Sequence, residues 1–219
     1  MDGMARAGTE RARAASTREL LLRAAEQLFA ERGIDGTRIR EVTERAGQAN
    51  SSALHYHFGS REGLLRTIVT RHRQRVDAVL APELAALERG GCDGLPALVS
   101  AYVEAEASEL AHESGLDCLR IVSQLAHETG FRDGEPHPAL QGSALWRLFG
   151  LIAERTTDST RLSEPLARER VELMVMTVGA AFADRARHMQ AGRPCPVEDP
   201  AYRADLAAMV TAMLGAPAA

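Results

Sequence analysis

Residues 48–63, QANSSALHYHFGSREG, gather serines, two histidines, a tyrosine and an arginine, which could bind a metal, catalyse a reaction or contact another molecule. A metal site is disfavoured because His55 and His57, two positions apart on a helix, point about 200° away from each other. Catalysis is disfavoured because no G-x-S-x-G turn or nearby strand would hold one of the paired serines beside a base and a third orienting group. The stretch is therefore either a solvated helix face above the apolar Leu54 and Phe58, or a surface that touches another molecule.

The elements around this stretch are all expected to be helices. Runs of β-branched residues with a period of two are almost absent, whereas apolar residues recur at intervals of three and four. Capping residues and glycines delimit the first helices of the chain. These expected helices run from Ser16 to about Gly33, from Thr37 to Gly47, from near Asn50 to His57 and from Ser60 to about Pro82. Two short helices braced by a longer preceding one form a helix-turn-helix arrangement.

Beyond Pro82 the spacing predicts five more helices, so the chain is expected to be all-α with about nine helices. Their expected ranges are 94–112, 116–129, 137–156, 164–190 and 200–214. The predicted organisation is a flexible arm over 1–15, a three-helix helix-turn-helix domain over 16–59, a connecting helix over 60–82 and a larger helical domain over 83–219.

Charge is unevenly distributed along the chain. Residues 1–75 hold 14 arginines against 9 acidic residues, whereas residues 76–219 hold 12 arginines against 21 acidic residues. The sequence contains no lysine, and a guanidinium group suits bidentate contact with phosphate, although codon bias explains such a composition equally well. The chain thus joins a small basic module to an acidic body.

The remaining composition predicts a cytoplasmic protein without a cofactor or metal. Its three cysteines lack C-x-x-C spacing, which argues against a disulfide framework and a zinc ribbon. The richest apolar stretch, Leu173–Ala183, is far shorter than the ~20 residues that a membrane-spanning helix needs.

The polar stretch has the composition that a DNA-reading helix requires. Small hydrogen-bonding side chains belong at its N-terminal end, where base edges are read, and flat or cationic donors belong at its far end, where phosphates pass. Candidates for the first role are Asn50, Ser51 and Ser52, and candidates for the second are His55, Tyr56, His57 and Arg61.

From about Ser16 to Ile68 the sequence resembles the tetracycline-repressor family of bacterial transcription regulators, through AAEQLFAERGIDGTRIREVTERAG followed by LHYHFGSREGLL. His55 stands where that family commonly has a phosphate-contacting tyrosine, so either His55 or the adjacent Tyr56 can take this role. The turn before Leu54 is one residue longer than the commonest version, which leaves the register of base contacts open by one position. The expected DNA-binding residues are Thr37, Arg38, Gln48, Asn50, Ser51, Ser52, His55, Tyr56, His57 and Arg61.

The resemblance implies a homodimer whose N-terminal domain binds double-stranded operator DNA and whose larger domain dimerises and binds a small hydrophobic or aromatic effector. The expected ligand-binding residues are Tyr102, Arg120, Gln124, His127, Trp146 and Phe149. The expected dimer-interface residues are Met176, Gly179, Ala180, Ala183, Leu206, Met209, Val210 and Met213. Solvated helix faces and ordinary core packing explain the same patterns, so both alternatives stay open.

The predicted function is that of a non-enzymatic transcriptional regulator, a repressor released from a palindromic operator by its effector. An architectural DNA-binding protein without an effector would be expected to be basic throughout, yet the body is acidic. An all-helical enzyme would need converging titratable groups, whereas the histidines of the body are scattered along the sequence.

Overall fold

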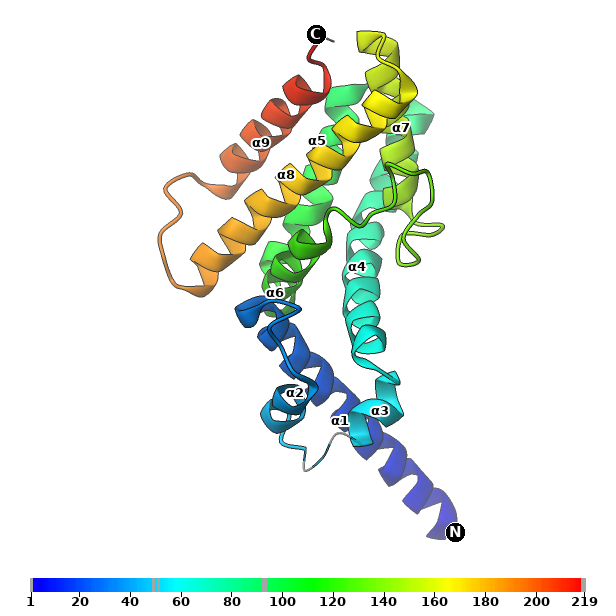
Figure 1. Cartoon of the computed structure of the whole chain (residues 1–219), viewed down its shortest axis with the longest axis vertical. Helices are drawn as coiled ribbons and strands as arrows, with labels where there is room; N and C mark the ends of the chain where they lie inside the picture. Colours follow the sequence, from blue (N-terminus) through cyan, green and yellow to red (C-terminus); the bar gives the residue numbers. More distant parts are fainter. Residues whose placement is uncertain (1, 49, 51, 92–93, 218–219) are drawn as a thin grey trace. The chain divides into compact units, whose positions relative to one another are not determined.

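A computed structural model describes residues 2–48, 50, 52–91 and 94–217, with side chains from Ala15 onward (Figure 1). These described residues form nine α-helices and two 3-10 helices, which confirms the all-α prediction. The chain divides into two compact units, residues 1–69 and 70–219. Within the described ranges, no helix combines the length and the apolar character needed to cross a membrane.

The first unit contains α1 (Asp2–Arg32), α2 (Ile39–Arg45), α3 (Ser52–Phe58) and the first turns of α4 (Arg61–Gly90). The prediction that the first helix begins at Ser16 is wrong, because α1 is helical from Asp2, through the segment expected to be an arm. Alanine and arginine, which make up eight of the first fifteen residues, have high helix propensities, so the helix runs through the capping sequence at Ser16.

The apolar core of the first unit comes mainly from α1. Its fully buried side chains include Leu21, Leu22, Leu28 and Phe29 of α1, Val42 of α2, Leu54 of α3, and Leu64 and Ile68 of α4. Within the described part of α3, Leu54 alone is buried, while the other side chains are exposed or half-buried. This helix is therefore anchored at one point and presents most of its surface outward.

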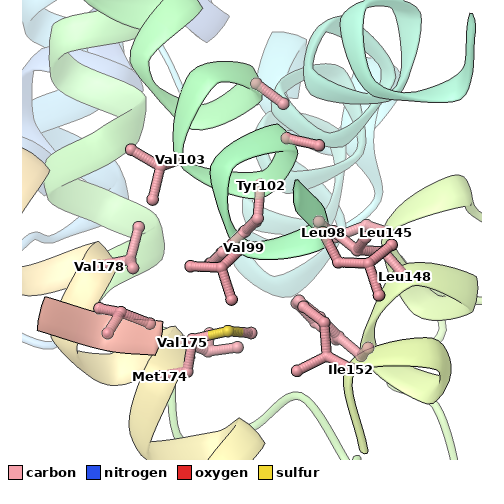
Figure 2. Close-up of a cluster of buried hydrophobic side chains, with 14 of the residues drawn as sticks. Leu98, Val99, Tyr102, Val103, Leu145, Leu148, Ile152, Met174, Val175 and Val178 are labelled. Atoms are coloured by element: carbon pink, nitrogen blue, oxygen red, sulfur yellow. The ribbon is translucent and has the colours of Figure 1, made fainter. Parts of the chain in front are cut away.

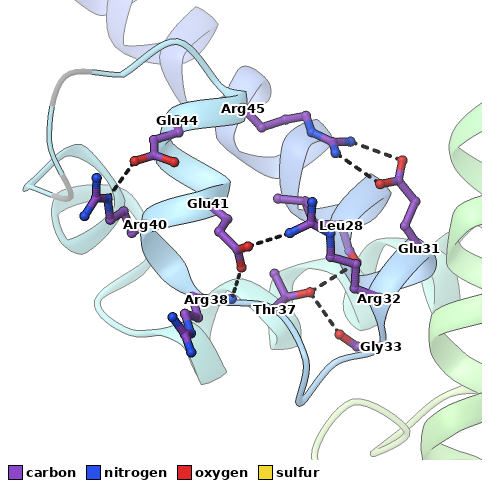
Figure 3. A network of polar contacts seen from close by, with 10 residues as sticks. All are labelled: Leu28, Glu31, Arg32, Gly33, Thr37, Arg38, Arg40, Glu41, Glu44 and Arg45. Carbon is purple, nitrogen blue, oxygen red and sulfur yellow. Dashed lines mark hydrogen bonds and ion pairs between the residues drawn. The ribbon is translucent and has the colours of Figure 1, made fainter.

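Ion pairs on the surface of the first unit tie α2 to α1, as Figure 3 shows. Arg45 of α2 donates to both carboxylate oxygens of Glu31 of α1, each at 3.1 Å, and Arg32 of α1 pairs with Glu41 of α2. Glu41 also accepts a hydrogen bond of 2.9 Å from the backbone N–H of Arg38, which caps α2 and lowers the pKa of Glu41. Exposed ion pairs contribute little net stability, so their main effect is to orient α2.

The second unit contains the rest of α4 together with α5 (Leu95–Ala107), η1 (Ser108–Ala111), α6 (Glu113–Val122), η2 (Ser123–Leu125), α7 (Ala144–Thr160), α8 (Glu164–Gln190) and α9 (Asp199–Leu214). The predicted range of α8 is confirmed, and that of α9 is correct to within one residue. Helix α8 packs against α6, α7 and α9, while α5 packs against α7 and α9.

Several predicted helix ends in this unit are wrong. The helix predicted over 116–129 is α6, which begins at Glu113 and ends at Val122, before the short η2. The helix predicted to end at 156 continues to Thr160. Helix α4 does not stop near Pro82 but continues to Gly90, because Leu80 and Leu84 are buried on either side of the proline and hold the helix together. Helix α7 begins at Ala144 rather than at 137, since Ser143 caps it by accepting a hydrogen bond of 3.0 Å from the N–H of Trp146.

The core of the second unit lies between α5, α7 and α8, as Figure 2 shows. Its labelled side chains are Leu98, Val99, Tyr102 and Val103 of α5, Leu145, Leu148 and Ile152 of α7, and Met174, Val175 and Val178 of α8. Every one of them is at least nine-tenths buried. The core thus fixes α5 and α7, which carry the aromatic residues predicted to bind an effector.

Candidate functional site

Helix α3 presents a polar, aromatic face outward. Leu54 faces the core, whereas Ser52, His55 and Tyr56 are exposed, and 82% of the Tyr56 surface remains accessible. The ring of His57 is half-buried, with its centroid 5.0 Å from that of Tyr56 in an edge-on arrangement. The arrangement leaves one phenol and one imidazole available to a molecule that approaches this helix.

Side chains at both ends of α3 hold it in place. Asn50 accepts a hydrogen bond of 3.0 Å from the backbone N–H of Ser52 through its side-chain oxygen, an Asx-type turn that starts the helix. At the other end, Nδ1 of His55 lies 3.0 Å from the carbonyl oxygen of Gly59. Of the residues predicted to read bases, Asn50 and Ser52 are thus exposed beside the helix start, and Ser51 lies outside the described residues.

The arginines of the first unit differ in how they are paired. Arg40 contacts Glu44 at 2.6 Å, and Arg45 contacts Glu31 as described above. The guanidinium of Arg38 is exposed and forms no ion pair among the described residues, although its charge helps to lower the pKa of Glu41. Arg38 therefore has the greatest freedom among these arginines to bind an external anion.

Thr37 and Arg61, which are both predicted to contact DNA, also have partners within the first unit. The Thr37 hydroxyl is buried and donates toward the carbonyl oxygens of Leu28 and Gly33, at 3.1 and 2.9 Å. The Arg61 guanidinium donates to the Ile34 carbonyl and lies over the Phe29 ring, 5.6 Å from its centroid. Both residues therefore position the loop after α1. Gln48, a further predicted DNA contact, is half-buried, and its side-chain amide donates to the Ala46 carbonyl at 3.2 Å.

In the second unit, the three aromatic residues predicted to bind a ligand belong to one cluster. Tyr102 and Phe149 meet edge to face at 5.5 Å, and Phe131, which sequence reasoning missed, lies 5.9 Å from Phe149 and 5.1 Å from Trp146. Tyr102 and Phe149 are almost completely buried, while Trp146 is half-buried. The cluster combines large apolar surfaces with a phenol and an indole.

Two carboxylates that the sequence analysis did not identify lie near this aromatic cluster, in addition to the predicted polar residues. Arg120 hydrogen-bonds to Gln190 at 2.6 Å, Gln124 bonds to the backbone of Arg120, and His127 is exposed. The burial of Tyr102, together with the charges of Glu106 and Glu172, raises the pKa of its phenol, which places these carboxylates near the cluster. They were missed because an isolated glutamate in a helical sequence is usually a solvated residue.

Glu106 also belongs to a buried ionic cluster with His72, Arg75 and Glu109. The Glu109 carboxylate accepts hydrogen bonds from the Arg75 guanidinium at 2.7 and 2.6 Å, and one of its oxygens lies 3.0 Å from Nδ1 of His72. Nε2 of His72 lies 3.4 Å from Glu106. Burial alone lowers the pKa of His72, but the two carboxylates outweigh it and raise this pKa to about 9. The cluster ties α4 to α5 and η1.

Several residues predicted to form a dimer interface lie inside the unit. Ala183, Leu206 and Val210 are buried, and a Cβ added at Gly179 would lie 3.7 Å from the Cα of Ser123, so these positions pack within the chain. Met213 is half-buried. Exposed apolar side chains on the outer faces of α8 and α9 include Leu166, Leu173, Met176, Ala180 and Met209. The seven-residue spacing of Leu166, Leu173 and Ala180 could have identified this stripe.

The fold and the outward face of α3 define an all-helical protein with an N-terminal helix-turn-helix module. Residues 21–68 match the family of bacterial regulatory proteins described as the tetR family. This match covers the helix-turn-helix region of the chain. A curated relative, the HTH-type transcriptional repressor BepR of Brucella suis biovar 1 (strain 1330), is 38% identical over 63 residues. That match covers 29% of this chain and 30% of the relative.

Solved structures share the fold over most of the chain. A TetR-like transcriptional regulator from Rhodococcus sp. RHA1 has a TM-score of 0.51 at 19% identity, covering 90% of this chain and 93% of its own. NalD, the secondary repressor of the MexAB-OprM multidrug efflux pump in Pseudomonas aeruginosa, has a TM-score of 0.50 at 18% identity, covering 89% and 93%. At such identities the similarity concerns the fold.

Proposed function

We propose that this chain is a sequence-specific DNA-binding transcriptional regulator, a repressor that a small effector releases from a palindromic operator. The observation that carries the proposal is the exposed polar face of α3, anchored by Leu54 and adjoined in sequence by the helix-turn-helix partner α2. A short helix held at one apolar point, with serine, imidazole and phenol groups outward, suits insertion into the major groove. BepR and NalD, which are both named as repressors, support the same assignment.

A mobility-shift assay with the DNA upstream of the chain's own gene tests this proposal against its rivals. A regulator should shift this DNA at concentrations at least ~10³-fold below those needed for random DNA. An architectural protein should bind both DNAs alike. An all-helical enzyme should bind neither.

Replacing Arg38 with alanine should weaken binding to operator and random DNA by similar factors, on the order of tenfold, because a phosphate contact carries no base information. The slope of log affinity against log salt should become shallower by about one unit for each phosphate that the protein no longer neutralises. Fluorescence anisotropy at several salt concentrations measures both effects.

The double variant Arg40→Gln/Glu44→Gln is the matched control, because it removes an exposed ion pair of α2 without changing the net charge. It should leave the salt slope unaltered. If the double variant and Arg38→Ala change the slope equally, or if Arg38→Ala alters base preference, the phosphate role of Arg38 is wrong.

The proposed effector site is the aromatic cluster of Tyr102, Phe131, Trp146 and Phe149. Large apolar surfaces with a few polar groups are typical of small-molecule sites, and they favour a hydrophobic or aromatic compound. Tyr102 also neighbours Glu106, which contacts His72 of α4. A ligand that displaces Tyr102 would thereby disturb the packing of α4 within this unit.

Titration with an aromatic compound that releases DNA should change the fluorescence of Trp146, the single tryptophan of the chain. The same compound should weaken DNA binding by ~5–150-fold, and DNA should weaken its binding by the same factor, because coupling is reciprocal. Trp146→Phe provides the spectroscopic blank. A compound that releases DNA with unchanged Trp146 emission and undiminished affinity for Phe149→Ala would place the effector elsewhere.

The proposed dimer interface is the exposed stripe of α8 and α9. Leu173, Met176 and Met209 expose 47%, 40% and 57% of their surfaces, an arrangement that a second pair of helices would cover. Two-fold symmetry of such a dimer accounts for a palindromic operator.

A further inference from the structure

The contact between His55 and Gly59 determines which ring nitrogen of His55 carries the proton. Nδ1 of His55 lies 3.0 Å from the Gly59 carbonyl oxygen, and a carbonyl oxygen can only accept a hydrogen bond. Nδ1 must therefore be the donor. In the neutral ring the other nitrogen, Nε2, then has no proton and exposes a lone pair.

The fixed tautomer limits what neutral His55 can do on DNA. Phosphate oxygens are acceptors, so an unprotonated Nε2 cannot donate to them and its lone pair repels them. Once protonated, the same nitrogen becomes a donor with a positive charge, which forms a strong, charge-assisted hydrogen bond to phosphate. Tyr56, with 82% of its surface exposed, can donate its phenolic proton without any change of charge.

We infer that His55 contacts the DNA backbone only as an imidazolium, so that each subunit takes up a proton at His55 when it binds DNA. The inference rests on the proposed DNA-binding function. Tyr56 is then the phosphate donor at every pH near neutrality, and His55 adds a second contact whose strength increases as the pH falls. On this inference both His55 and Tyr56 contact phosphate, Tyr56 at every pH near neutrality and His55 only when it is protonated.

The other charged or titratable groups at this end of α3 are few in the described part of the first unit. Helix α3 itself carries Tyr56 and His57, α1 brings Arg18 to 5.2 Å from the centroid of the Phe58 ring, and α4 begins with Arg61 and Glu62. Guanidinium groups, carboxylates and phenols ordinarily keep one charge state between pH 6 and 8. His57 is therefore the competing source of a pH-dependent contact with DNA.

The test measures affinity for a labelled duplex of random sequence between pH 8 and 6, at constant salt, because a phosphate contact is independent of sequence. The wild type should bind ~3–10-fold more tightly at pH 6, within the limit of ~10-fold per pH unit for each proton taken up. His55→Gln should lose most of this slope. A slope that is lost in His57→Gln, itself a predicted phosphate contact, and kept in His55→Gln would assign the proton to His57. A slope that survives in His55→Gln, or a wild type without one, would overturn the inference.

A measurement without DNA separates this inference from the proposed function. Long-range ¹⁵N–¹H correlation spectra of the free protein at pH 8 should identify His55, by comparison with His55→Gln, as the Nδ1-protonated tautomer. An Nε2-protonated ring would overturn the inference while leaving DNA binding intact. If the ring shows the expected tautomer but the protein binds no DNA at pH 6 or at pH 8, the proposed function is wrong. The inference, which depends on that function, is then wrong as well.

Discussion

Replacing Glu109 with glutamine should lower the free energy of unfolding of the second unit by ~3–5 kcal/mol, because it leaves the buried His72 and the half-buried Arg75 without their shared anion. Glu109 is 1% exposed and accepts two hydrogen bonds from Arg75 as well as contacting His72. Glutamine keeps the size of the side chain but not its charge, so packing is little affected. Urea unfolding followed by circular dichroism measures the difference.

Glu104→Gln is the control for this change. Glu104 lies on α5 and pairs with Arg203 at 3.0 Å, but half of its side chain is exposed, so the loss should stay below ~1 kcal/mol. Equal effects of the two substitutions would show that the buried cluster contributes no more than a surface pair.

The same cluster should make the stability of the second unit fall at both ends of the pH range. Folding raises the pKa of His72 from 6.5 to about 9. The stability that protonated His72 adds to the folded state is therefore complete below pH 6.5 and disappears as the pH rises through about 9. Burial raises the pKa of Glu109, but Arg75 and His72 outweigh it and lower this pKa from 4.5 to about 2, so its contribution disappears as the pH falls from 4.5 toward 2. Unfolding midpoints from pH 3 to 10 test this, and His72→Gln should remove the alkaline decline.

Replacing Leu173 with glutamate should convert the protein to monomers and weaken operator binding by ~10²–10⁴-fold. A charged side chain at the centre of the exposed stripe would be buried without a partner in the dimer. Each monomer would then bind a single half-site and lose the gain that comes from two linked contacts. Sedimentation velocity and anisotropy with the operator measure the two consequences.

Val79→Glu is the corresponding control, since Val79 is similarly exposed, at 44%, but lies on α4 away from the stripe. It should remain a dimer with unchanged operator affinity. A dimeric Leu173→Glu protein, or a monomeric wild type that still binds its palindrome tightly, would remove the basis for the proposed interface.

The sequence predicts features that depend on local spacing. Helical periodicity predicts that Leu54 of α3 is buried in the core and that Tyr56 lies on the exposed face of the helix, and the structure agrees. It misses features that depend on distant partners, because nothing local marks them. The anion for Arg75 is supplied 34 residues later by Glu109, and Arg61 donates to a carbonyl 27 residues earlier. Both arginines therefore look like solvated or DNA-facing residues in the sequence alone.

The pairing of arginines in the first unit has a consequence for how quickly the protein can find its operator. Arg32, Arg40 and Arg45 are each neutralised by a glutamate of the same unit, so the positive charge available to random DNA is smaller than the arginine content implies. Weak attraction to random DNA shortens each unproductive encounter along the chromosome. We therefore expect a search dominated by brief contacts and frequent dissociation, with prolonged residence reserved for sites that the face of α3 recognises.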